Sequence, residues 1–190
     1  YPESRFRGHV LAAGAEASRM RNDFEKSIEY GDKALALDPN NAVALILVAD
    51  ALSEGSKPSQ ADFQEHLKKS EDYSKRALEL LPTFFSTWPR DPAVPAEQYE
   101  LQEDYIEAQV HATLGFVYYR RNELPAAETE LKKATDLNQL RPNSADFERL
   151  GLVQVQQKKY DLARDSFQRC IDVAGFSSET CQRRLELLEK

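Results

Sequence analysis

The pattern of apolar positions between residues 114 and 134 predicts two amphipathic helices joined by a tight turn. One face of the first helix carries Leu114, Val117 and Tyr118. The second helix has small and apolar residues at the spacing of three and four that places side chains together: Leu124, Ala127, Leu131 and Ala134. A helical hairpin of this kind has an apolar face that it cannot bury alone. The sequence therefore predicts neighbouring hairpins that cover it.

The same pattern recurs along the chain in three other places. Residues 150–170 repeat it with a Leu-Gly pair, an aromatic residue and a small-residue position: Leu150, Gly151, Tyr160, Ala163, Phe167 and Cys170. Two weaker copies precede the central one, with key positions at Gly14, Phe24, Ala34 and Pro39, and at Val48, Ala77 and Pro82. A helical hairpin repeated about every 34 residues is typical of an array of stacked hairpins.

This pattern resembles the tetratricopeptide repeat (TPR) family, in which Leu-Gly-x-x-Tyr is followed by Ala-x-x-x-Phe and then proline. Residues 114–118 match the first part of the motif, and residues 163–167 match the second. The resemblance implies an all-α fold, a right-handed α-solenoid of about four repeats with a C-terminal capping helix. Members of the family usually bind other proteins through the inner face of the stack.

The predicted boundaries make residues 1–190 a single domain. The four repeats cover residues 7–40, 41–82, 96–138 and 143–175, and the capping helix covers 177–190. A turn-rich segment, 53–60, is predicted as an insertion loop, after which Ser59 and Asp62 resemble a capping box that starts the next helix. The proline-rich segment 83–95 is predicted as a second loop, because its prolines disfavour a helix. A helix extended at its N-terminus is predicted from Ala96 onward.

Composition and charge narrow the classes of function. The formal net charge of −7 disfavours nucleic-acid binding, because an acidic surface repels phosphate. No apolar run approaches the roughly 18 residues that a membrane span needs, so we expect no membrane insertion. The chain begins with Tyr1 and Pro2 rather than methionine, and we expect a trimmed or mature form whose compartment the sequence leaves unknown.

The candidate chemical groups are sparse. Glu107 and His111 lie four residues apart, as metal ligands can on one helix face, but the repeat register favours a packing role for His111. The acidic cluster around Glu100 and Glu103 is interpreted as a solvated helix face rather than as catalytic carboxylates. There is no glycine-rich phosphate loop and no Cys-x-x-Cys pair. We expect no metal, no cofactor and no enzymatic activity.

Cys170 and Cys181 leave two alternatives open. Cys170 occupies the small-residue position that alanine holds in the other copies, and this position faces the next helix. Cys181 lies one turn into the predicted capping helix. The pair either forms a disulfide that joins the cap to the last repeat, or remains as two buried free thiols. A disulfide would favour a periplasmic or secreted location over the cytoplasm.

The resemblance implies a partner-binding groove lined by the first helix of each repeat. The repeat register places these residues in it: Ile46, Asp50, Gln109, Phe116, Tyr119, Arg120, Arg149 and Gln156. Relatives that hold acidic C-terminal peptides use Lys and Asn on the first helices. Here the matching positions hold Ala12, Glu16 and Asp50, so an acidic C-terminal peptide is not the expected ligand.

An aromatic cluster in the proline-rich loop, Phe84, Phe85 and Trp88, has two interpretations. The favoured one is that the side chains fold back and fill the gap made by the insertion. The alternative is that they form a lip of the groove and gate entry.

Two functions remain at this point. The first is a non-catalytic module that binds a peptide or protein segment in the concave groove. The alternative is a scaffold subunit of a larger assembly, such as one of the cell envelope. That scaffold would associate with its own copies through the apolar stretch at residues 42–52, which makes a homo-oligomer possible.

Overall fold

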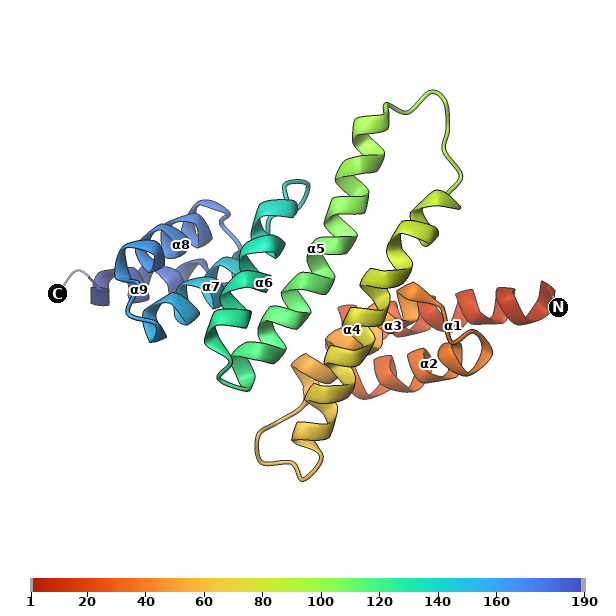
Figure 1. The fold of residues 1–190 in the computed structure, drawn as a ribbon, viewed down its shortest axis with the longest axis horizontal. Helices are drawn as coiled ribbons and strands as arrows, with labels where there is room; N and C mark the ends of the chain where they lie inside the picture. Colours follow the sequence, from red (N-terminus) through yellow and green to blue (C-terminus); the bar gives the residue numbers. More distant parts are fainter. Residues whose placement is uncertain (1, 189–190) are drawn as a thin grey trace. The chain divides into compact units, whose positions relative to one another are not determined.

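The computed structural model describes the backbone of residues 2–188 and the side chains from residue 7 to residue 188 (Figure 1). The residues that it describes form nine α-helices and no strand. In chain order the helices are α1 (Pro2–Met20), α2 (Phe24–Leu37), α3 (Ala42–Gly55), α4 (Phe63–Ser86), α5 (Ala96–Arg120), α6 (Leu124–Leu137), α7 (Ser144–Gln156), α8 (Tyr160–Asp172) and α9 (Ser178–Leu188).

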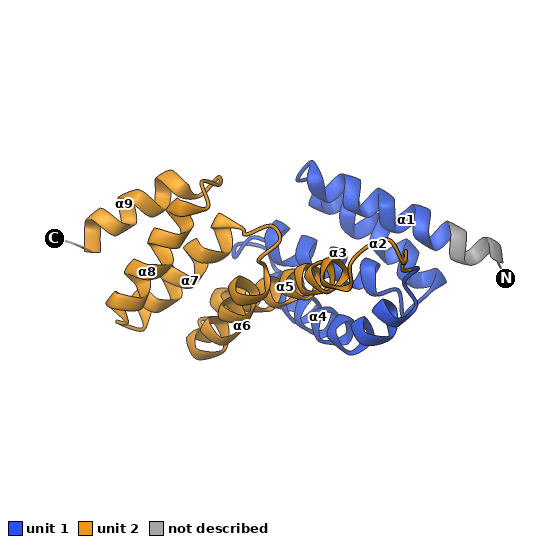
Figure 2. Cartoon of the chain, turned by 90° about the horizontal axis from the view of Figure 1, so that it is seen from above, with its two compact units in different colours: residues 1–89 blue, residues 90–190 orange. Residues whose placement is uncertain are grey.

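The helices form two compact units, residues 1–89 and residues 90–190 (Figure 2). In unit 1, α1 packs on α2 and α3 packs on α4, while α2 also contacts α3. Unit 2 repeats this arrangement with α5 on α6, α7 on α8 and α6 on α7, and α9 packs on α8. The first helices of successive pairs are also neighbours, α1 with α3 and α5 with α7. The prediction of a single domain over residues 1–190 stays a prediction.

Three of the four hairpins turn in the same way. Asn22, Asn122 and Lys158 have positive φ angles of 57°, 62° and 61°. In each turn the next residue donates its backbone N–H to a carbonyl five residues earlier, at 2.9 Å. Asparagine tolerates this left-handed conformation better than most residues, and two of the three turns use it. The shared turn shows that α1–α2, α5–α6 and α7–α8 are copies of one unit.

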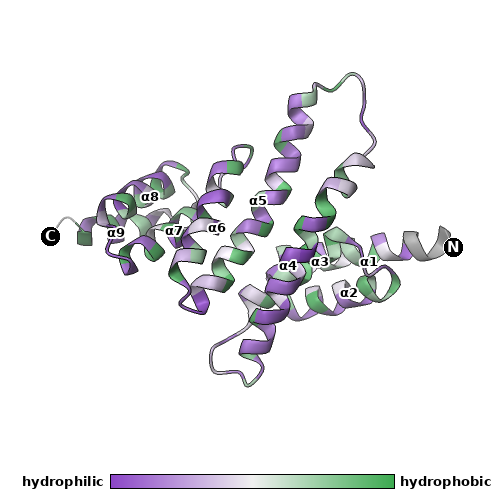
Figure 3. Ribbon diagram, viewed as in Figure 1, coloured by the Kyte–Doolittle hydropathy of each residue, from purple (hydrophilic) through white to green (hydrophobic). Residues whose placement is uncertain are grey.

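Glycines allow the helices to approach closely, which gives the Leu-Gly motif its physical basis. A Cβ atom at Gly115 would lie 2.6 Å from Leu131 Cγ of α6. A Cβ atom at Gly151 would lie 2.5 Å from the ring of Phe167, which is the aromatic residue of the Ala-x-x-x-Phe segment. The glycine of the Leu-Gly pair and the bulky residue of the following helix therefore pack against each other, and the motif contains both residues of this contact. Most helices have hydrophilic and hydrophobic sides (Figure 3).

The loop between α3 and α4 differs from the prediction. Helix α3 continues through Ser53 and Glu54, so the loop covers residues 56–62 rather than 53–60. The predicted capping box at Ser59 is wrong, because α4 starts at Phe63 with Asp62 as its N-cap residue. The Asp62 side chain does not cap the backbone and instead pairs with His66 Nε2 at 3.2 Å. The longer spacing between Ala34 and Ala77 predicts an insertion here, but it does not give the exact bounds of the loop.

The end of α4 also differs from the prediction, because the helix continues through Pro82 to Ser86. Proline removes the backbone hydrogen bond to the carbonyl of Leu78 and crowds that carbonyl, but its φ angle is compatible with a helix. The side chain of Phe85 is 7% exposed, so burial in the following turn favours continuation of the helix. Phe84 and Phe85 therefore lie on a helix and not in the proline-rich loop. At the other end of the chain α1 starts at Pro2, earlier than residue 7, as a first-turn proline permits.

We predict opposite effects for two glycine-to-alanine substitutions. Gly115→Ala should lower the free energy of unfolding by about 1–3 kcal/mol, because the new methyl group overlaps Leu131. Gly14→Ala is the matched control, since its Cβ would meet the ring of Tyr30 at an ordinary distance of 3.4 Å. It should raise the free energy of unfolding by about 0.5–1 kcal/mol through better helix propensity. Urea denaturation of the full chain measures both, and an equal effect of the two substitutions would contradict the close-approach explanation.

Candidate functional site

The groove residues predicted on α5 and α7 come together on one face of unit 2. The guanidinium of Arg149 lies 4.0 Å from the centroid of the Phe116 ring, and that of Arg120 lies 5.3 Å from it. Tyr119 lies beside them, and its hydroxyl accepts a hydrogen bond from Gln156 Nε2 at 3.4 Å. We call this set, with Gln109 seven residues before Phe116, the α5–α7 face. It presents an aromatic ring, guanidinium groups, a phenol and amides.

The groove residues predicted in unit 1 lie on α3. Asp50 accepts a hydrogen bond from Arg19 Nε of α1 at 2.5 Å, so this carboxylate is paired with a cation across the two first helices. Ile46 lies one turn earlier on α3 and is half-buried. A groove continuous through all four hairpins stays a prediction.

The aromatic cluster lies at the C-terminal end of α4. The ring of Phe84 has its centroid 5.7 Å from that of Phe85, and Trp88 lies 5.5 Å from both. The rings meet tilted or edge to face, which is the favourable arrangement for aromatic pairs. Both hypotheses for the cluster, filling of a gap and a lip of the groove, stay predictions.

His111 joins α5 to α6. Its Nδ1 lies 2.5 Å from Glu130 Oε2, its Nε2 lies 3.5 Å from Glu107 Oε1, and the side chain is buried. Burial raises the pKa of Glu130, but the hydrogen bonds from His111 and Lys133 outweigh it and hold that pKa below its ordinary value of 4.5. The residues that the structure describes contain no group of three or more side chains suited to a metal. His111 is placed as an interhelical packing residue.

A hydrogen-bonded chain of serine, histidine and aspartate escaped the sequence analysis. Ser56 Oγ lies 2.8 Å from His66 Nδ1, and His66 Nε2 lies 3.2 Å from Asp62 Oδ2. A serine protease uses the two ring nitrogens the other way round, with serine on Nε2. Here the three side chains connect the loop at residues 56–62 to the first turn of α4. The spacing of these residues matches no motif, so only the folded loop shows the contact.

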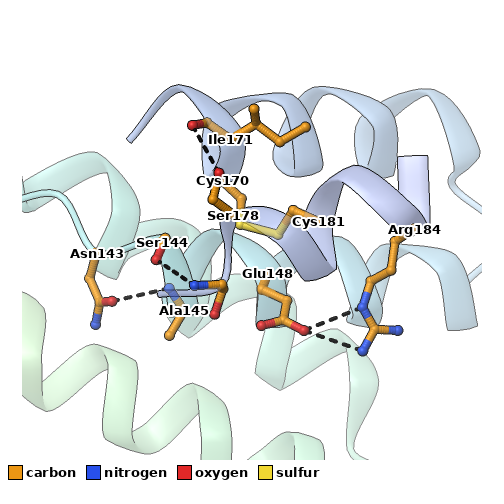
Figure 4. The surroundings of a disulfide bond; sticks show 10 residues. Asn143, Ser144, Ala145, Glu148, Cys170, Ile171, Ser178, Cys181 and Arg184 are labelled. Carbon is orange, nitrogen blue, oxygen red and sulfur yellow. Dashed lines mark hydrogen bonds and ion pairs between the residues drawn. A yellow bond between two sulfur atoms is a disulfide. The ribbon is translucent and has the colours of Figure 1, made fainter. Parts of the chain in front are cut away.

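A disulfide joins α8 to α9 (Figure 4). Cys170 and Cys181 are both fully buried, and their Cα atoms are 6.2 Å apart. Beside the disulfide, Arg184 of α9 pairs with Glu148 of α7 at 3.2 Å, and the backbone N–H of Ser177 donates to Ser144 Oγ at 3.2 Å. Helix α9 also packs Leu185 and Leu188 against the apolar cluster of α7 and α8. It thus covers the end of the last helix pair.

The apolar stretch at residues 42–52 is not the exposed contact that the scaffold hypothesis needs. Most of its side chains are buried within the chain, among them Leu45, Leu47, Val48 and Leu52. The stretch is apolar because α3 lies in the interior, where a helix can be hydrophobic on all sides. The expectation of an exposed self-association surface there is wrong.

No helix in the described part of the chain combines the length and the apolarity that crossing a membrane requires.

Comparison with known proteins agrees with this arrangement. Residues 147–175 match the sequence model of the tetratricopeptide repeat. Among solved structures, the chain is similar to the MamA protein, at 18% identity and a TM-score of 0.61, covering 99% of this chain and 82% of that one. It is also similar to TTC0263, a thermophilic TPR protein of Thermus thermophilus, at 16% identity and a TM-score of 0.63, covering 95% and 80%. No curated protein sequence matches significantly.

At these identities the structural similarity is one of fold. The described residues form an α-solenoid of paired helices, and the predicted all-α fold class is confirmed. One repeat, at residues 147–175, thus matches the tetratricopeptide repeat by sequence, and the described helices share the fold of tetratricopeptide repeat proteins. Proteins of this class generally act as interaction modules for other proteins.

We predict that Glu130 makes stability depend on pH below 4.5. Because its pKa is lowered in the folded state, its contribution is complete above the ordinary value of 4.5 and is lost as the pH falls through the lower, folded value. The difference in unfolding free energy between the wild type and Glu130→Gln should therefore shrink as the pH falls from 7 to 3. Lys133→Gln removes one of the two hydrogen bonds and should weaken this pH dependence. Urea denaturation measures it, and a difference that is constant with pH would contradict the assignment.

We predict that loss of the disulfide loosens α9 first. The double substitution Cys170→Ala/Cys181→Ala should reduce stability by about 2–3 kcal/mol, since the bond closes a short loop with a sequence separation of 11. Hydrogen exchange should accelerate in α9 more than in α5 or α6. The wild type with reductant is the matched comparison, and unchanged exchange in α9 in both cases would show that noncovalent contacts alone hold this helix.

Proposed function

We propose that the chain is a non-catalytic module that binds a peptide or protein segment on the α5–α7 face. The observation that supports this most is the Phe116 ring, which has one guanidinium 4.0 Å and another 5.3 Å from its centroid. Aromatic and arginine side chains contribute most of the binding energy in many protein interfaces. They are present here together, on first helices that lie side by side.

The other side chains of the α5–α7 face suit recognition of a polypeptide backbone. Gln109 and Gln156 carry amides that both donate and accept hydrogen bonds, and Tyr119 carries a hydroxyl that does the same. A bound segment would exchange the hydrogen bond between Tyr119 and Gln156 for contacts with its own amides. The aromatic ring of Phe116 would contact an apolar side chain of the segment. No group on this face is arranged as a nucleophile with a base, which favours binding over catalysis.

The disulfide bears on where this binding takes place. A fully buried disulfide that joins two packed helices forms and persists in an oxidising compartment. We therefore place the protein in a periplasmic or secreted environment. Partners would then be proteins of that same environment.

The test has two stages and begins with a photo-crosslinking amino acid at Gln109. The same amino acid at Thr129, which is exposed on α6, is the matched control. Mass spectrometry of crosslinks formed in the source cell identifies the segment held at Gln109 and absent at Thr129. We expect a defined peptide from one or a few proteins. Equal crosslinking at the two positions would contradict a specific face.

The second stage measures the affinity of the synthetic segment for the purified chain. Tyr119→Ala/Gln156→Ala should weaken binding about tenfold or more, because it removes the phenol and an amide that would bond the segment. Thr129→Ala should leave the affinity unchanged. Thermal denaturation by circular dichroism shows whether each variant is folded. A folded double variant with wild-type affinity would exclude the α5–α7 face as the binding site.

A further inference from the structure

Helix α7 has a second face, directed away from the one that it turns toward α5. Phe147 lies two residues before Arg149 and Gln154 two residues before Gln156, which is about 200° around the helix, and Leu150 lies about 100° from Arg149. These three side chains form the floor of a groove whose walls are α6 and α8. Its volume of about 440 Å³ lies within the range of roughly 300–1,000 Å³ that is common for ligand sites.

The groove has an apolar floor and a rim without net charge. Phe147 and Leu150 are buried in the floor, and Leu162 of α8 adds an aliphatic side chain that is 48% exposed. On the rim, Lys132 pairs with Asp136 at 2.5 Å, and the guanidinium of Arg169 lies over the Phe147 ring at 5.7 Å. With Asp165 the rim has two cations and two anions. A strongly charged ligand would therefore gain little electrostatic binding energy from this rim.

Gln154 supplies a hydrogen-bond donor at the bottom of the groove. The side chain is 6% exposed, and its Oε1 accepts a hydrogen bond from Ser166 Oγ of α8 at 2.7 Å. Within the described part of the chain its Nε2 has no hydrogen-bond partner, yet it is not among the fully enclosed polar atoms, so it faces the groove. In the free chain this donor can bond only water in the groove. A ligand that offers an acceptor would take the place of that water.

We propose that this groove is a second binding site, and that it takes an extended, uncharged peptide segment with an aliphatic side chain. The aliphatic side chain would lie on Phe147 and Leu150, and a backbone carbonyl would accept the Gln154 amide. A helix is a poor occupant because its carbonyls are already bonded within the helix. An extended segment has free carbonyls at regular intervals and projects alternate side chains to the same side. The charge balance of the rim favours a segment without ionised groups.

This site is independent of the proposed function. The α5–α7 face and the groove lie on opposite sides of α7, so one chain can bind two segments at once. Loss of binding at one site would leave the other unaffected.

The test uses a capped pentapeptide, acetyl-Thr-Val-Leu-Val-Thr-amide, and the full chain labelled with nitrogen-15. NMR titration follows the side-chain amide of Gln154 together with the backbone amides of α6, α7 and α8. We expect saturable shifts that centre on the groove, with transfer of magnetisation from the Gln154 amide protons to the peptide. The same peptide with glutamate in place of leucine should bind at least tenfold more weakly.

Two variants separate recognition by the amide from a general apolar contact. Gln154→Leu/Ser166→Ala removes the donor together with its internal partner, and should weaken binding about fivefold. Thr129→Ala is the matched control, because Thr129 is exposed on α6 outside the lining of the groove, and it should retain the wild-type affinity. Shifts that do not saturate, equal affinity for the two peptides, or unchanged affinity in the folded double variant would each overturn the proposal. If the double variant does not fold, the absence of magnetisation transfer from Gln154 in the wild type overturns it instead.

Discussion

The close approach of the two helices in each pair is the constraint on which the array depends. Gly115 against Leu131 and Gly151 against Phe167 bring the helix axes near enough for apolar faces to interlock. The same logic holds between pairs, where the lack of a side chain at Gly31 makes room for Val48 of α3. These short distances between helices are compatible with the tight left-handed turns within the pairs and with the contacts between successive pairs. Each first helix then comes to lie beside the next first helix.

The parts of the fold that the sequence predicts well are those set by local periodicity. The hairpins α5–α6 and α7–α8, and the N-terminal extension of α5 from Ala96, agree with the repeat pattern. The errors occur where a contact made in the folded chain overrides a local rule. Pro82 is a helix breaker by local rules, but burial of Phe85 in the next turn favours continuation of α4. Asp62 is a good capping residue, but His66 competes for its carboxylate.

The candidate site divides in the same way. The repeat register was sufficient to assign Phe116 and Arg149 to one face, because the position of a residue on a helix depends only on its number. The register says nothing about hydrogen bonds between helices, so the bond between Ser166 and Gln154 could not be predicted. The contact of Ser56 with His66 was missed for a similar reason, since the intervening loop has no periodicity. Hydrogen bonds of this kind can therefore be assigned only once the distances between side chains in the folded chain are known.

The bond between Cys170 and Cys181 has a consequence for how copies of the chain can meet. In domain swapping, a terminal helix leaves its own molecule and takes the same place in another. Helix α9 would otherwise be suited to such an exchange, because it is short and covers an apolar cluster. The covalent link keeps α9 on its own α8. Oxidation therefore protects this helix from exchange between copies during folding at high concentration.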